Sequence, residues 1–252
     1  MNYFNSYLAC SAFFLNLSDS FRKTFIYQDR WKQLLKGLGV TLQITVFAAV
    51  IGIIIGFIVA AVRSTYDKNL QGKKCRKLSD YLLKFFNGLC NVYLTVIRGT
   101  PVVVQLMIIH FIVLASVRNG IYAAIVAFGV NSGAYVAEIV RSGIMSIDKG
   151  QFEAGRSLGF NYVQTMWYIV FPQAFKNILP ALGNEFIVLI KETSVAGYVA
   201  LQDITYVGNL IRSRTYEAFF PLITVAVIYL TIVMILSYFL KKLERRLRNS
   251  DH

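Results

Sequence analysis

The sequence predicts an all-α integral membrane protein with about five transmembrane helices. Of its 252 residues, 56% are hydrophobic and 15% are charged, whereas about a quarter of the residues in a soluble domain are charged. Residues 38–62 and 218–240 contain no charged side chain, and each run exceeds the roughly 20 apolar residues that cross a bilayer as a helix. The remaining charges lie between apolar runs, which is typical of membrane proteins.

The five spans are predicted, in chain order, at 38–62, 101–117, 121–140, 184–201 and 218–240. The first contains Gly52 and Gly56, a small-xxx-small pair that lets two helices approach closely in lipid. The second follows a helix-like stretch at 79–97 and a break at Arg98, Gly99, Thr100 and Pro101. Two interpretations of the break stay open. Pro101 is either the first helical residue of a span, with Arg98 reaching the cytosolic interface, or part of a hinge at the cytosolic mouth.

The chain divides into three predicted regions: an N-terminal extracytoplasmic or interfacial segment, 1–36, a transmembrane domain, 37–240, and a basic cytosolic tail, 241–252. The run from Tyr7 to Leu17 is too short to cross a bilayer and lacks the basic flank of a signal peptide. We expect it to lie at the interface or to pack on the bundle.

Lysine and arginine predict the orientation. Sixteen of them lie in 63–84, 141–176 and 241–248, whereas three, Arg118, Arg212 and Arg214, lie in the other two loops between spans. The positive-inside rule then places the C-terminus in the cytosol and the N-terminus outside. Five basic residues within 22–36 favour the opposite orientation, but the bias of sixteen to three in the other segments is larger.

Several functional classes are disfavoured. The net charge of +13 does not indicate nucleic-acid binding, because the basic residues lie between apolar runs. Cys10, Cys75 and Cys90 have no metal-ligand spacing. The Gly72-Lys73 pair lacks the first glycine of a nucleotide-binding loop, and no catalytic set of side chains emerges. We expect a non-enzymatic chain without a cofactor of its own, with His110 as a neutral, hydrogen-bonded core residue.

One polar connection between spans has a residue pattern that predicts a defined local structure. It is 150–159 (GQFEAGRSLG), which is followed by 169–172 (IVFP). In this stretch Glu153 is predicted to head a short helix that Gly159 stops at a positive φ, and a second helix runs to Pro172. Ala154 and Gly155 are small enough for a partner surface to approach closely.

Other motifs stand in order along residues 37–240: 37–42 (GLGVTL), 97–101 (IRGTP) with Gln105, 134–144 (AYVAEIVRSGI), 172–174 (PQA), 179–184 (LPALGN) and 191–194 (KETS). Together with 150–159 they resemble the permease subunits of ABC importers for polar amino acids of the glutamine, histidine, arginine or cystine type. The stretch 150–159 resembles that family's "EAA" loop, with Gly155 where the family most often has alanine.

The resemblance implies a type I ABC-importer permease fold in a bacterial cell (inner or plasma) membrane. It also implies a cytosolic coupling loop at about 141–183 that docks on a separate ATPase, with contacts from Glu153, Ala154, Gly155, Gly159 and Pro172. The implied partners are ATPase subunits that bind ATP, a second identical or different permease, an extracytoplasmic substrate-binding protein, the lipid bilayer and a polar amino acid. The alternatives are an importer of another small solute and a non-ABC channel.

Ionisable residues inside the spans are the candidates for a translocation path, because charges at that depth are costly. They form one polar face and one polar break: Asn131, Ser132, Tyr135 and Glu138 on the third span, and Lys191, Glu192, Thr193 and Ser194 on the fourth. These residues either contact a zwitterionic substrate or stabilise the bundle, with Glu138 paired to Arg141 or Lys191. Glu185 is expected near the cytosolic end of its span, against the coupling loop.

Overall fold

The computed structural model describes residues 18–72 and 77–248, and every regular element in these ranges is helical. The long helices are α2 (Arg30–Asn69), α3 (Leu78–Gly99), α5 (Gly120–Met145), α8 (Phe171–Glu192) and α10 (Phe219–Arg248). The shorter α-helices are α4 (Val102–Ile108), α6 (Lys149–Ser157), α7 (Tyr162–Thr165) and α9 (Ile204–Thr215). The π-helical turns are η1 (Arg22–Ile26), η3 (Ile109–Val113) and η4 (Met166–Val170), and the 3-10 turns are η2 (Tyr27–Asp29) and η5 (Thr193–Val199). The predicted all-α class is confirmed.

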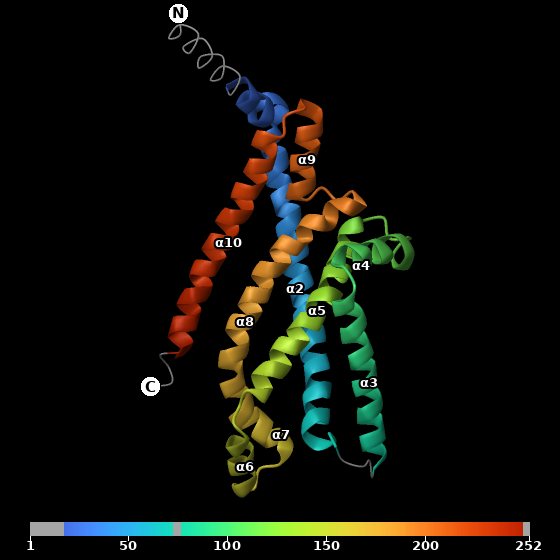
Figure 1. Ribbon diagram of the computed structural model, residues 1–252, viewed down its shortest axis with the longest axis vertical. Helices are drawn as coiled ribbons and strands as arrows, with labels where there is room; N and C mark the ends of the chain where they lie inside the picture. Colours follow the sequence, from blue (N-terminus) through green and yellow to red (C-terminus); the bar gives the residue numbers. More distant parts are fainter. Residues whose placement is uncertain (1–17, 73–76, 249–252) are drawn as a thin grey trace, which may run out of the picture.

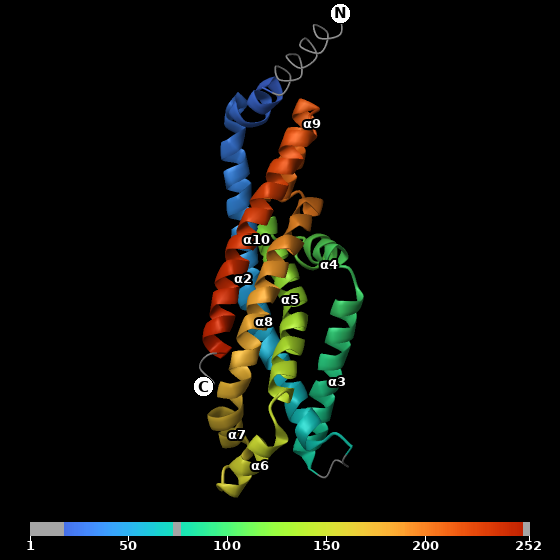
Figure 2. The same cartoon turned by 60° about the vertical axis from the view of Figure 1, so that its left-hand side comes forward.

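The long helices form an elongated bundle around α2 and α5 (Figure 1). One end of the bundle holds α6, α7, the end of α2 and the start of α3, and the other end holds α9 and the start of α2 (Figures 1 and 2). Helix α10 runs from the α9 end back toward the α6 end. The predicted coupling loop therefore lies at the same end of the molecule as the helix ends that flank the first basic loop.

Three of the described helices are long and apolar enough to cross a membrane: Ser18–Lys68, Gly120–Met145 and Phe219–Leu247. A fourth span results if α3 and the helix that follows it, Val102–Val113, count as one bent unit. Helix α8 has 22 residues, which is about 33 Å of helix, but it carries several charges. Among the described residues there are therefore three spans by length and composition, or four with the bent pair, where the sequence predicted about five.

The predicted second span at 101–117 is wrong. The long helix is α3, and the chain then turns by 109° into the short helix Val102–Val113. Thr100 and Pro101 are both extended, with ψ of 148° and 137°, and proline cannot continue a helix from the preceding residue. Pro101 is therefore the N-cap residue of α4, which precedes the first helical residue, Val102. An apolar run alone did not reveal this fold-back.

The bounds of the predicted regions do not coincide with breaks in the backbone. Helix α2 continues across residue 36, α10 continues past residue 240, and most of 141–183 is helical. The predictions for the run 7–17 and for Cys10 and Cys75 fall outside the described residues, and Cys90 is a free thiol.

The central packing is that of α2 on α5, and glycine makes it possible. A Cβ added at Gly56 would lie 2.4 Å from Val136 Cγ1, and one at Gly52 would lie 3.1 Å from Ser132 Cβ. The predicted role of the Gly52 and Gly56 pair in helix packing is confirmed. Around it lies a buried apolar core that includes Ile44, Ala48, Leu106, Phe128 and Leu189.

Gly56→Leu should destabilise the protein by about 1–3 kcal/mol, because the added side chain overpacks the α2–α5 contact. Gly39→Leu is the matched control on the same helix, since no atom lies within 4 Å of a Cβ placed there. Thermal unfolding of the purified protein in detergent measures the difference. Equal melting temperatures for the two variants would contradict the packing role of Gly56.

Candidate functional site

Helix α6 forms the core of the predicted coupling loop, and its two ends are firmly capped. The Asp148 side chain accepts a hydrogen bond from the Gly150 N–H at 2.7 Å. At the other end Gly159 has a φ of +79°, and the Phe160 N–H donates to the Gly155 carbonyl at 3.0 Å. A glycine with positive φ that closes such a bond is a common helix stop. The predicted positive φ of Gly159 is confirmed.

The predicted position of Glu153 at the head of this helix is wrong. Helix α6 begins at Lys149, with Asp148 as its N-cap, and Glu153 lies in its middle with an exposed side chain. The sequence reading missed the aspartate five residues earlier, although aspartate is a favoured N-cap. The charge of Glu153 is therefore available to a partner and does not act on the helix N-terminus.

Gly155 serves packing within the chain, which corrects the expectation that it faces a partner. It is buried, and an added Cβ would lie 2.6 Å from Thr165 Cγ2 and 3.1 Å from Ile169 Cδ1. The missing side chain lets α6 lie directly against α7 and η4. Ala154 is exposed, so of the two small residues only this one lies on an open face.

Pro172 does not end a helix, as was predicted, but lies in the first turn of α8. The helical run continues from α7 through η4 into α8. The π-helical turn η4 closes when the Phe171 N–H donates to the Met166 carbonyl, and such a turn accommodates a proline that has no N–H to give. At its start, Asn161 and Gln164 exchange reciprocal hydrogen bonds of 2.9 Å each.

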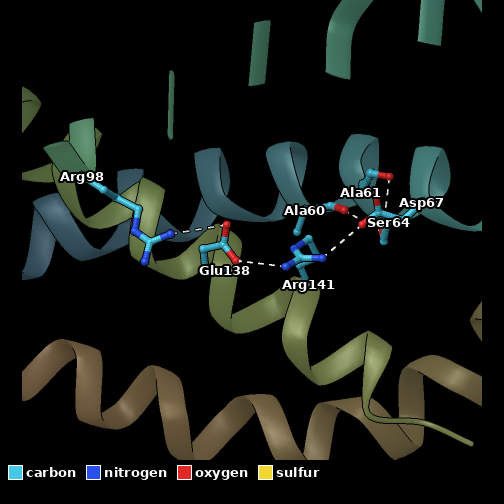
Figure 3. Close-up of polar contacts among 7 residues, drawn as sticks. All are labelled: Ala60, Ala61, Ser64, Asp67, Arg98, Glu138 and Arg141. Atoms are coloured by element: carbon cyan, nitrogen blue, oxygen red, sulfur yellow. Dashed lines mark hydrogen bonds and ion pairs between the residues drawn. The ribbon is translucent and has the colours of Figure 1, made fainter. Parts of the chain in front are cut away.

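A chain of four charged side chains connects α3, α5 and α2 (Figure 3). Arg98 Nη1 lies 3.5 Å from Glu138 Oε1, and Glu138 Oε2 lies 3.4 Å from Arg141 Nη2. Arg141 Nη1 then lies 3.1 Å from Asp67 Oδ2. Of the two pairings proposed for Glu138 as a structural residue, the one with Arg141 is formed.

Glu138 and Lys191 are not brought together. A hydrogen bond of 2.8 Å from Ser132 Oγ to Glu185 Oε1 sets the register of α5 against α8, which run in opposite directions. Each charged residue lies six positions beyond its own member of that pair, toward opposite ends of the bundle. At 1.5 Å per residue the two are about 18 Å apart along the helices. A site that uses both for one zwitterion is therefore not formed.

The remaining residues of the two polar segments have local partners. The Arg98 guanidinium lies 5.8 Å from the centre of the Tyr135 ring. Helix α8 ends at Glu192, and η5 begins at Thr193, whose hydroxyl donates to the Ile190 carbonyl at 2.7 Å. The predicted break at 191–194 is thus present. Lys191 is exposed, whereas Ser194 is half-buried.

Gln105 holds the break between α3 and α4, a role that the sequence reading did not assign. Its Nε2 donates to the carbonyls of Ile97 and Thr100 at 2.7 and 3.1 Å, and its Oε1 accepts from Asn131 Nδ2 at 3.0 Å. Asn131 is only 2% exposed. The break lies at the end of α3 remote from α6 (Figure 1), and a hinge at Arg98, Gly99, Thr100 and Pro101 stays a prediction.

Two further expectations are wrong. Glu185 lies 14 residues into α8, about 21 Å from the start of that helix, so it does not reach the coupling loop. His110 lies in η3, and its Nδ1 is buried with no hydrogen-bond partner among the described residues.

Within 18–72 and 77–248 no group of three or more metal-ligating side chains is close enough to hold a metal ion.

Comparison with known proteins identifies relatives over most of the chain. The family model described as "Binding-protein-dependent transport system inner membrane component" matches residues 80–249. The arginine transport system permease protein ArtQ of Bacillus subtilis is 38% identical over 221 residues, which are 86% of this chain and 94% of that protein. The glutamine transport system permease protein GlnP of Escherichia coli K12 is 35% identical and covers 85% of this chain and 93% of its own.

Solved structures of ABC transporters are also similar to this chain. A crystal structure of an amino acid ABC transporter with histidines has a TM-score of 0.74 at 37% identity, and it covers 85% of this chain and 94% of its own. The MetNI methionine ABC transporter in an inward-facing conformation has a TM-score of 0.72 at 21% identity over 87% of this chain and 98% of its own, which shows the fold alone. The chain is a multi-pass membrane protein with the type I ABC-importer permease fold, and it belongs to the binding-protein-dependent transport system inner membrane component family.

Proposed function

We propose that this chain forms the membrane path of an ATP-driven importer for a polar amino acid. The observation that supports this most is the similarity to arginine and glutamine permeases over at least 85% of the chain, at 35–38% identity. The solved amino acid ABC transporter adds support from the fold. Among the alternatives, neither a channel nor an importer of another solute class is favoured by these relatives.

The proposal includes partners. A second permease, identical or different, completes the path, and an extracytoplasmic binding protein delivers the amino acid. ATP is bound and hydrolysed by separate ATPase subunits, because the chain's only glycine-lysine candidate, Gly72-Lys73, lacks the first glycine of a phosphate-binding loop.

We propose α6 as the element that docks on the ATPase. Its exposed residues include Glu153, Ala154 and Ser157, followed by the exposed C-cap Leu158. Gly155 packs the opposite side onto Thr165. The helical run from α7 through η4 to the end of α8 is continuous. Because the interior of a protein is close-packed, a displacement of α6 would be passed into α8 as a rigid movement.

We also propose that the α6 end lies in the cytosol and the N-terminus outside. The end of α2, the start of α3 and α6 lie at one end of the bundle, and the basic C-terminal part of α10 points toward it (Figure 1). The surplus of lysine and arginine in these segments supports that orientation.

For the polar face of α5 we propose a structural role. Asn131 is bonded to Gln105 at 3.0 Å, and Glu138 has two arginine partners. Both side chains hold neighbouring helices in place, so neither is free for a substrate in this arrangement.

Gly159→Leu should leave the permease inserted but abolish most coupled uptake. Leucine at a φ of +79° costs roughly 1–2 kcal/mol and would redirect the chain between α6 and α7. Gly159→Asn is the control, since asparagine tolerates positive φ and should retain most activity. The measurement is uptake together with substrate-stimulated ATPase in proteoliposomes. Full coupling in the leucine variant would contradict the docking role of α6.

The orientation is tested in a chain whose three cysteines are replaced by serine. A membrane-impermeant maleimide should label Arg118→Cys in intact cells and should label Ser157→Cys only after permeabilisation. Both positions are exposed in the structure. The opposite labelling pattern would place α6 outside and beyond the reach of a cytosolic ATPase.

The structural role of Glu138 predicts non-additive stability changes. Glu138→Gln and Arg98→Gln should together cost less than the sum of the single losses, by about 1 kcal/mol, since these side chains are 27% and 45% exposed. Lys191→Gln is the control and should be additive with Glu138→Gln. Chemical unfolding in detergent measures the coupling. Additive losses in the Arg98 pair, with uptake lost in Glu138→Gln at unchanged stability, would instead indicate a substrate contact.

A further inference from the structure

A cavity of about 490 Å³ opens between the end of α2, the end of α5, α6 and α7. The side chains around it include Asp67, Lys68, Lys149, Phe152, Glu153, Arg156 and Tyr162. Its volume lies within the range of ligand-binding pockets, about 300–1,000 Å³. The charged chain of Figure 3 ends beside this cavity, at Asp67.

The lining has more positive than negative charge. Lys68, Lys149 and Arg156 contribute three cations, and none of them forms an ion pair with another residue in 18–72 or 77–248. Of the two carboxylates, Asp67 is already neutralised by Arg141 at 3.1 Å. Glu153 alone is left to balance the three cations.

The cations are positioned by groups that cannot neutralise them. The Lys68 ammonium lies 2.9 Å from the centre of the Phe152 ring, which attracts a cation without removing its charge. Arg156 Nε donates to the Phe152 carbonyl at 3.4 Å, and the part of the chain that the structure describes offers no carboxylate to its guanidinium. Burial raises the pKa of the Tyr162 phenol, so this group stays a neutral donor. The cavity thus presents hydrogen-bond donors and more positive than negative charge, with Glu153 as its only carboxylate among the described lining residues that is not held by Arg141.

The surroundings of the cavity favour a protein partner over a free ion. Four large side chains within three positions of cavity-lining residues are 66–72% exposed: Leu158, Val163, Trp167 and Tyr168. Val163 and Trp167 line a second pocket, which shares Tyr162 with the cavity. Tryptophan, tyrosine and arginine are the residues most enriched at the energetic centres of protein interfaces. A cationic cavity beside an aromatic surface therefore fits a partner that carries an acidic side chain next to apolar ones.

We infer that this cavity receives a carboxylate side chain of the ATPase subunit that docks on α6. The inference rests on the proposed function and adds the chemistry of the contact. A carboxylate is matched in charge and geometry to arginine and lysine donors. Insertion would place it between α2 and α6, so that both helices are held by one partner group.

The first test uses the assembled complex and a carbodiimide, which joins an amine to a carboxylate only when the two are in contact. Mass spectrometry should find an amide between Lys149 or Lys68 and an aspartate or glutamate of the ATPase. Lys149→Arg should lose its cross-link but keep assembly, because arginine retains the charge without a reactive amine. An assembled complex with no cross-link from either lysine would overturn the inference.

The second test is charge reversal. The variant Lys149→Glu/Arg156→Glu should weaken ATPase binding by about tenfold or more and flatten its salt dependence. The control Lys241→Glu/Lys242→Glu makes the same change in net charge at exposed positions of α10 and should bind as the unmodified chain does. Size-exclusion chromatography checks that both variants are folded. If both double variants bind the ATPase equally weakly, the loss of affinity is explained by net charge alone, and the inference is overturned.

A small anion is the competing occupant. If inorganic phosphate raises the melting temperature of the permease alone, and Lys149→Glu/Arg156→Glu removes that effect without changing ATPase assembly, the cavity is an anion site and the inference fails. A failure of the proposed function looks different, because the unmodified chain would then bind no ATPase at all.

Discussion

The close approach of α2 and α5 is the constraint on which the other contacts depend. Glycines contribute from both sides: an added Cβ at Gly56 would lie 2.4 Å from Val136, and one at Gly129 would lie 2.8 Å from Ile51. In lipid, where there is no hydrophobic drive between helices, such small residues allow the van der Waals contact that holds helices together. Only at this separation does Arg141 of α5 reach Asp67 of α2 at 3.1 Å. The charged chain is thus a consequence of the glycine packing.

The same principle of close packing operates at the α6 end. Gly155 brings α6 against Thr165, and Gly159 turns the chain so that α7 can lie beneath it. The sequence therefore uses one glycine for distance and another for backbone direction. Their combined effect is a compact unit whose outer face, with Glu153 and Ala154, stays open.

Features that depend on local sequence were predictable, and those that depend on tertiary placement were not. The charge-free runs predicted α2 and α10, and Gly159 predicted its own positive φ. The second span failed because an apolar run after Pro101 has the same composition whether it crosses the bilayer or folds back. The pairing of Glu138 with Lys191 failed because helical spacing gives the face of one helix but not the offset between two. That offset comes from the Ser132–Glu185 contact.

Charged side chains are concentrated at the α6 end of the bundle, and two of them at the end of α2 make different contacts. Asp67 and Lys68 are neighbours at the end of α2, yet the aspartate is paired with Arg141 and the lysine lies over Phe152 of α6. The first contact ties α2 to α5, and the second ties α2 to the docking helix. A change of charge in the cavity would act within one residue of the Arg141 pair, and Coulomb forces are strong where water is partly excluded. The end of α2 is therefore the point at which a partner's charge and the permease's own charged network meet.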